Sequence, residues 1–102
     1  MNYNVKHEEE GDETTLEIDG TLDAITSPEL KPVVDRLVSE RHRRITLDLS
    51  ALRLIDNSGA AIIVELVKRI RAIGGDLKII GVRHEPMQVF RLLRLDRTVS
   101  IS

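Results

Sequence analysis

The fold is decided by residues 55–82, which read IDNSGAAIIVELVKRIRAIGGDLKIIGV. Apolar side chains recur every three or four positions from about Ser58 to Ile73, which predicts a helix with one buried face. Gly74 can take the left-handed conformation that ends a helix, and residues 77–82 predict a buried strand. The inward face is expected to hold Ile62, Ile63, Leu66, Val67, Ile70 and Ile73, and the outward face Lys68, Arg71 and an i, i+4 pair of Glu65 with Arg69.

The segments on either side of this stretch add further strands and helices. Alternation in residues 3–7 and 16–18, around a turn at 8–12, predicts an N-terminal β-hairpin. Ser27 as N-cap and Pro28 at the first helical position predict a helix that buries Leu30, Val33, Val34, Leu37 and Val38. Residues 45–49 have the length and β-branching of a strand.

Downstream, Glu85-Pro86 predicts a short third helix with Val89, Phe90 and Leu93 on one side, and Val99 and Ile101 are expected in a last edge strand. The resulting order is ββαβαβαβ. Alternating strands and helices predict an α/β fold, so residues 1–102 are expected to form one domain in which helices pack on a mixed β-sheet.

Composition favours a globular domain in a reducing compartment. The chain is 41% hydrophobic and 31% charged, and it has no cysteine for a disulfide or a thiolate metal site. It has no signal-like segment and no run of the ~20 apolar residues that span a bilayer, so a cytoplasmic protein with no direct membrane contact is expected. Residues 1–35 carry a net charge of −8 and residues 36–102 of +6. This asymmetry fits either an acidic face for a basic partner or a well-solvated surface.

Enzyme motifs are absent. The segment 56–59 lacks the Gly-x-Ser-x-Gly pattern of a nucleophile elbow, and no histidine is placed by sequence as its base. His7, His42 and His84 lack metal-ligand spacing, and the glycine pair 74–75 follows a helix instead of opening one. We therefore predict no enzyme, no metal and no cofactor.

Arginine runs at 41–44 and at positions 91, 94 and 97 are the only candidates for a nucleic-acid surface. The net charge is −2, and no aromatic residue is interleaved with these arginines for base stacking. Nucleic acid is therefore not expected as a partner.

Ser58 stands out because it lies where the helical period begins. Asp56, Asn57 and Ser58 can each cap a helix, which is more than one helix end requires, and Gly59 leaves the hydroxyl uncrowded. On chemistry alone, an N-cap and a hydroxyl kept accessible for function both remain open.

The same residues resemble the STAS domain of bacterial anti-sigma factor antagonists. The resemblance rests on Asp48-Leu49-Ser50, on Ile55-Asp56-Asn57-Ser58-Gly59, on Gly74-Gly75 before an apolar strand, and on Gly20-Thr21-Leu22-Asp23 followed by Ser27-Pro28-Glu29-Leu30. It covers nearly the whole chain in the same order.

The resemblance implies a partner switch that regulates transcription. The unphosphorylated protein would bind an anti-sigma factor that is also a serine kinase, so that a sigma factor is released. The kinase would phosphorylate Ser58, and a serine/threonine phosphatase would restore the binding form. By position, the partner-binding residues would be Thr21, Asp23, Asp56, Asn57 and Gly59. Asn57 replaces the serine that the family commonly has there, which leaves one hydroxyl in the motif.

Two rival interpretations use the same fold. One is a STAS accessory domain that supports a transporter or a signalling assembly without being phosphorylated, since a fold does not determine a function. The other is a sensor of a small ligand or nucleotide, for which the sequence offers no loop that cradles phosphate.

Overall fold

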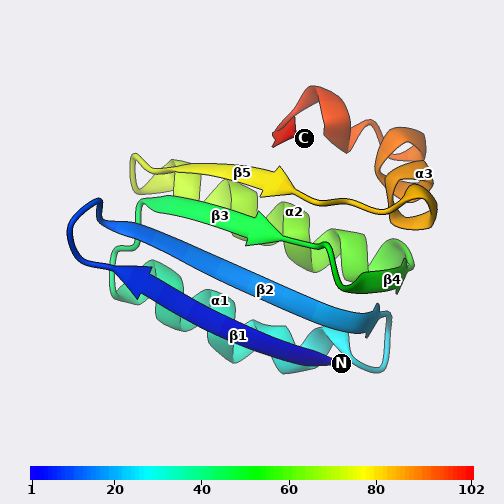
Figure 1. Cartoon of the computed structure of the whole chain (residues 1–102), viewed down its shortest axis with the longest axis horizontal. Coiled ribbons are helices and arrows are strands. Elements are labelled where there is room, and N and C mark those ends of the chain that lie inside the picture. The colour runs from blue at the N-terminus through cyan, green and yellow to red at the C-terminus, as the bar shows by residue number, and fades with distance from the viewer.

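A mixed β-sheet organises the chain, and the computed structural model describes all of residues 1–102 (Figure 1). In chain order the elements are β1 (Asn2–Glu8), β2 (Glu13–Leu22), the 3₁₀ turn η1 (Ser27–Leu30), α1 (Lys31–Ser39), β3 (Arg44–Asp48), β4 (Leu52–Ile55), α2 (Asn57–Ala72), β5 (Asp76–Ile80), α3 (His84–Leu92), the 3₁₀ turn η2 (Leu95–Arg97) and β6 (Ser100–Ile101). The predicted α/β fold with a mixed sheet is confirmed. Strand β4, which the sequence pattern does not predict, is the one addition to the strands.

The sheet has the order β1-β2-β3-β5-β6, and β4 pairs with the far end of β2. Only β1 and β2 are antiparallel; the other pairs are parallel. Strand β2 is long enough to pair with β3 through residues 13–17 and with β4 through residues 20–22. Gly20 has a φ of 96°, and the pairing register shifts between Gly20 and Thr21. This shift brings the ends of β2 and β4 together, immediately before α2.

The core lies between the sheet and two helices. Helices α1 and α2 both pack on one face of the sheet, while α3 lies at its end beside β4 (Figure 1). Strand residues that face the helices are buried, and the residues between them are polar and partly exposed, as expected when one face of a sheet is covered. The predicted inward face of α2 is confirmed: Ile63, Leu66, Val67 and Ile70 are buried, and Ile62 and Ile73 are partly buried against the core.

Three details of the sequence prediction are wrong. Glu65 and Arg69 do not pair with each other, because Lys31 and Asp35 of the neighbouring α1 are closer partners. Leu93 is 41% exposed, since α3 ends at Leu92 and the chain turns away. Ser27 does not cap a helix; it begins η1, whose N-cap is Thr26.

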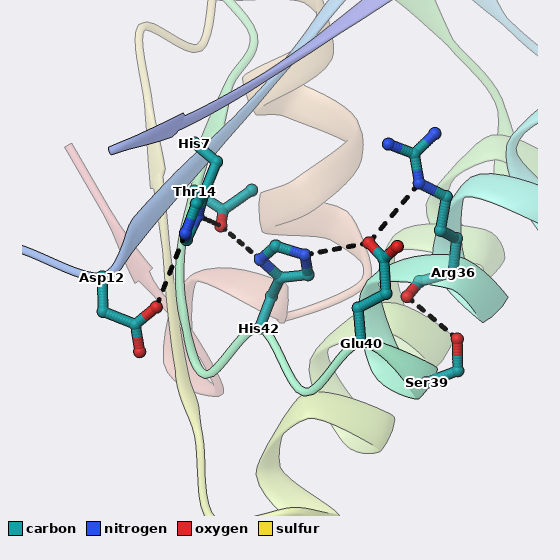
Figure 2. Close-up of polar contacts among 7 residues, drawn as sticks. All are labelled: His7, Asp12, Thr14, Arg36, Ser39, Glu40 and His42. Atoms are coloured by element: carbon teal, nitrogen blue, oxygen red, sulfur yellow. Dashed lines mark hydrogen bonds and ion pairs between the residues drawn. The ribbon is translucent and has the colours of Figure 1, made fainter. Parts of the chain in front are cut away.

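A chain of hydrogen bonds joins the β1–β2 hairpin to the turn that follows α1 (Figure 2). Its centre is Thr14, which is fully buried and lies 2.9 Å from Nδ1 of His7 and 2.7 Å from Nδ1 of His42 through its hydroxyl oxygen. Nε2 of His42 lies 3.1 Å from a carboxylate oxygen of Glu40. Two histidines whose spacing in the sequence does not suggest metal ligands thus enclose a buried polar group.

Glu40 is the acceptor at one end of this chain of hydrogen bonds. Its hydrogen bond with His42 holds the pKa of Glu40 below the usual value, so the carboxylate is ionised and can only accept. In its neutral form, an imidazole that donates from Nε2 of His42 to Glu40 has Nδ1 free to accept the Thr14 hydroxyl proton. The Thr14 oxygen is then free to accept the Nδ1–H of His7.

Thr14→Val is expected to lower the free energy of unfolding by about 1–3 kcal/mol. Valine has nearly the same shape but leaves both histidine nitrogens without their partner, and that loss is the cost of a buried polar group left unpaired. Urea denaturation of Thr14→Val against Thr15→Val, a half-buried neighbour whose hydroxyl makes no hydrogen bond, measures the difference. Equal stability of the two variants would show that the network contributes nothing.

Candidate functional site

Ser58 lies exposed in the first turn of α2, and its hydroxyl has no hydrogen-bond partner within the chain. The N-cap is Asp56, with the extended backbone typical of that position, and its Oδ1 accepts the N–H of Gly59 at 2.9 Å. Asp56 also accepts the N–H of Ala60 at its carbonyl, at 2.9 Å. Because Asp56 provides the cap, the Ser58 hydroxyl is not needed for that purpose. The structure therefore favours an accessible hydroxyl over a capping one.

Gly59 has a different role from the one the sequence suggests. It is buried, and a Cβ at this position would lie 2.2 Å from the carbonyl oxygen of Leu22 and 2.9 Å from a side-chain carbon of Ile55. Glycine is required because α2 begins directly against the ends of β2 and β4. Gly59 thus sets where Ser58 stands, rather than simply leaving its hydroxyl uncrowded.

The loop after β2 is held by Asp23 and Thr26. Oδ1 of Asp23 accepts the N–H of Ile25 at 2.9 Å and that of Thr26 at 3.0 Å. The Thr26 hydroxyl accepts the Asp23 N–H at 2.9 Å and donates to the carbonyl of Thr21 at 2.8 Å. The two side chains close a compact turn of the kind that aspartate and threonine favour.

Hydrogen bonding to Asp23 keeps its carboxylate ionised. The bond from the Thr26 backbone N–H is the main cause that lowers the pKa of Asp23, and burial opposes it. Because the pKa of Asp23 is lowered on folding, the ionised carboxylate contributes its full stabilisation of the folded state at neutral pH. This stabilisation is lost only as the pH falls below the ordinary aspartate pKa of 3.8 and through the lowered pKa of Asp23.

Asp56 connects this loop to α2. Its Oδ2 accepts the N–H of Ala24 at 3.2 Å, and its own N–H donates to the carbonyl of Leu22 at 3.2 Å. The structure thereby brings together the six predicted site residues, Thr21, Asp23, Asp56, Asn57, Ser58 and Gly59. Asp56, Asn57 and Ser58 are exposed, and Thr21 and Asp23 are partly buried; Thr21, Asp23 and Asp56 build the frame around Asn57 and Ser58.

The sequence prediction missed Ile25. It lies in the loop between Asp23 and Thr26, and its side chain is 84% exposed, the highest value among the exposed large hydrophobic residues of the chain. The available signal was a large apolar, β-branched residue in the segment Asp23-Ala24-Ile25-Thr26-Ser27, whose Asp and Ser are residue types typical of turns.

A shallow groove of about 730 Å³ runs from Ser58 between α2 and the η1–α1 segment. Ion pairs cross it, with Lys31 3.2 Å from Glu65 and Arg69 2.5 Å from Asp35. The groove is open to solvent, which suits contact with another macromolecule better than enclosure of a small ligand. Its lining residues are Ser27, Pro28, Lys31, Ser58, Ala61, Ile62, Val64, Glu65, Lys68 and Arg69.

Two other features of the chain bear on its chemistry. No three His, Asp or Glu side chains converge as the ligands of a metal ion do. None of the helices combines the length and the apolar character that crossing a membrane requires.

Comparison with solved structures places this arrangement among known proteins. A proposed anti-sigma factor antagonist of Thermotoga maritima superposes with a TM-score of 0.88 at 26% identity, over 97% of this chain and 84% of that one. The Bacillus cell fate determinant SpoIIAA in its phosphorylated form gives 0.75 at 13% identity, over 99% and 91%. A sulfate transporter family protein from Wolinella succinogenes gives 0.75 at 19% identity, over 87% and 72%. The last two show a shared fold.

The family is established by the sequence itself. A model of the STAS domain family matches residues 4–102, which is nearly the entire chain. The Thermotoga maritima and Bacillus structures superpose on 97% and 99% of this chain. This chain belongs to the STAS domain family.

Proposed function

We propose that this chain is an anti-sigma factor antagonist that works as a phosphorylation-controlled partner switch. The observation that carries the proposal is the Ser58 hydroxyl: it is exposed in the first turn of α2, has no partner within the chain, and stands beside a preformed loop. Likeness to a proposed anti-sigma factor antagonist of Thermotoga maritima supports the class of partner.

In this proposal the unphosphorylated chain binds a serine-kinase anti-sigma factor, and the sigma factor is released. The kinase then transfers the γ-phosphoryl group of ATP to Oγ of Ser58, with loss of the hydroxyl proton and formation of ADP. The phosphorylated chain leaves the kinase. A serine/threonine phosphatase hydrolyses the phosphate ester and restores the binding form. The chain itself performs no catalysis.

The start of α2 can carry a phosphate without unfolding. The backbone N–H groups of Asn57 and Ser58 have no acceptor within the chain, and the helix dipole places partial positive charge at this end. A phosphoserine adds ~1.5–2 negative charges and three acceptor oxygens. Phosphorylation therefore changes the surface that a partner meets while the fold is retained.

The other predicted residues act mainly by shaping this surface. Asp23 and Thr21 form the loop, Asp56 joins the loop to α2, and Gly59 brings α2 close to β2. Asn57 is exposed next to Ser58, so it is the residue of this set best placed for direct contact.

The proposal is tested with purified serine-kinase anti-sigma factors from the source organism, each incubated with the chain and Mg·ATP. Mass spectrometry is expected to find one phosphoryl group on Ser58 of the wild type and of Ser50→Ala, a control at another exposed serine, and none on Ser58→Ala. Ser58→Ala is expected to remain bound to the kinase in the presence of ATP, while the wild type dissociates. Absence of both binding and phosphorylation with every kinase would reject the proposal and favour an accessory role in a transporter or another assembly.

A further inference from the structure

Ile25 is presented to solvent by a loop whose conformation does not depend on its side chain. The fold uses only the Ile25 N–H, which donates to Asp23 at 2.9 Å. The side chain is 84% exposed. Any residue with a backbone N–H would close the same turn, and glycine, asparagine, aspartate or serine would be more usual in a loop of this kind. The fold of the isolated chain therefore does not require an isoleucine side chain at position 25.

The loop is held in place before any partner arrives. Hydrogen bonds fix it on both sides of Ile25: the Thr26 N–H donates to Asp23 at 3.0 Å, and the Ser27 N–H donates to the Asp23 carbonyl at 2.8 Å. The Thr26 hydroxyl ties the loop back to Thr21 at 2.8 Å. An apolar side chain on a preformed loop loses little conformational freedom when it is buried, which favours binding.

A further hydrogen bond joins the Ile25 loop to the helix that carries Ser58. Ala24, the residue before Ile25, donates its N–H to Asp56 at 3.2 Å, and Asp56 is the N-cap of the helix that carries Ser58. A partner that covers the Ser58 hydroxyl therefore meets the Ile25 loop at the edge of the same contact. The two positions are joined through a single side chain, so the contact around Ser58 extends onto the loop.

We infer that Ile25 is the apolar anchor of this surface and inserts into a hydrophobic pocket of the anti-sigma factor. The inference rests on the proposed function and goes beyond it, because it assigns the binding free energy to the loop and the switching to Ser58. A few side chains that fill well-packed, desolvated pockets of the partner carry most of the binding free energy of an interface. Burial of an isoleucine side chain corresponds to about a tenfold to hundredfold gain in affinity.

The test compares Ile25→Ala with Leu92→Ala, a control whose leucine is 80% exposed on α3. Affinity is measured for the purified anti-sigma factor that the wild type binds, and thermal unfolding is followed in parallel. Ile25→Ala is expected to bind at least tenfold more weakly with an unchanged melting temperature, and Leu92→Ala is expected to bind like the wild type. In the Ile25→Ala variant, kinase and Mg·ATP are expected still to phosphorylate Ser58 at high kinase concentration.

The outcomes separate the two proposals. Wild-type affinity of Ile25→Ala, in a protein whose binding is still lost on phosphorylation of Ser58, would overturn the anchor and leave the proposed function standing. Equal weakening by Leu92→Ala would also overturn it, because exposed apolar area in general would then be responsible. An Ile25-dependent dimer of this chain in sedimentation, with unchanged binding of the anti-sigma factor, would assign the loop to a second copy instead. Failure of the wild type to bind any serine-kinase anti-sigma factor would reject both proposals.

Discussion

Ser58→Asp is expected to bind the anti-sigma factor about a hundredfold more weakly than the wild type, whereas Ser58→Asn is expected to stay within about threefold. The two replacements have nearly the same size and shape and differ in one negative charge. That charge would enter a contact next to the carboxylates of Asp56 and Asp23. Like charges brought together in an interface cost several kcal/mol, and about 2.8 kcal/mol is a hundredfold in affinity.

Titration calorimetry of the two variants with the purified partner measures this difference. Stability provides the control: the free N–H groups at the start of α2 favour a negative charge, so Ser58→Asp is expected to unfold at the same urea concentration as Ser58→Asn or slightly higher. Added salt is expected to reduce the gap in affinity, because salt screens exposed charges. If Ser58→Asn binds the partner as weakly as Ser58→Asp does, the shape of the side chain at position 58, and not its charge, controls binding.

Periodicity was sufficient to predict most of the fold. The α2 helix was expected from about Ser58 to Ile73 and runs over Asn57–Ala72, because its apolar period is regular and Gly74, with a φ of 80°, lies just beyond its end. Strand β4 was missed because Leu52–Ile55 is short and alternates poorly, with two exposed residues in the middle. Its strand conformation comes from pairing with the distant β2, which local sequence does not encode.

The candidate site was likewise only partly predictable from the sequence. Local chemistry pointed to Asp56 and Ser58, because capping residues cluster where a helical period begins. The reason for Gly59 could not be found locally, since the atom that excludes a side chain is the carbonyl oxygen of Leu22, thirty-seven positions away in the chain. The sequence predicts Asp23 as a partner-binding residue, and the structure adds that its Oδ1 accepts hydrogen bonds from three donors of its own loop. The contact between Gly59 and Leu22 depends on how β2 and α2 meet.

Gly59→Ala is expected to lower the free energy of unfolding by about 3 kcal/mol. The new Cβ would lie 2.2 Å from the Leu22 carbonyl oxygen and 2.8 Å from its carbon, and both are backbone atoms that cannot turn aside. Either α2 or the end of β2 must move, which strains the bond between the Asp56 N–H and that same carbonyl. Overpacking of this kind costs about 1–3 kcal/mol and occasionally more. Alanine is the better helix former by up to about 1 kcal/mol, so the measured loss is a lower limit on the packing cost.

Gly11→Ala is the matched control, because a Cβ there would meet only the Glu13 side chain at 3.6 Å, an ordinary contact. Chemical denaturation of both variants is expected to show a large loss for Gly59→Ala and a change within about 0.5 kcal/mol for Gly11→Ala. Folded Gly59→Ala protein is also expected to bind the partner more weakly, since the displaced helix carries Ser58 away from the Ile25 loop. A Gly59→Ala protein as stable as the wild type would mean that α2 is free to shift. The position of Ser58 would then not be fixed by the end of β2, and a rigid surface around that serine could not be maintained.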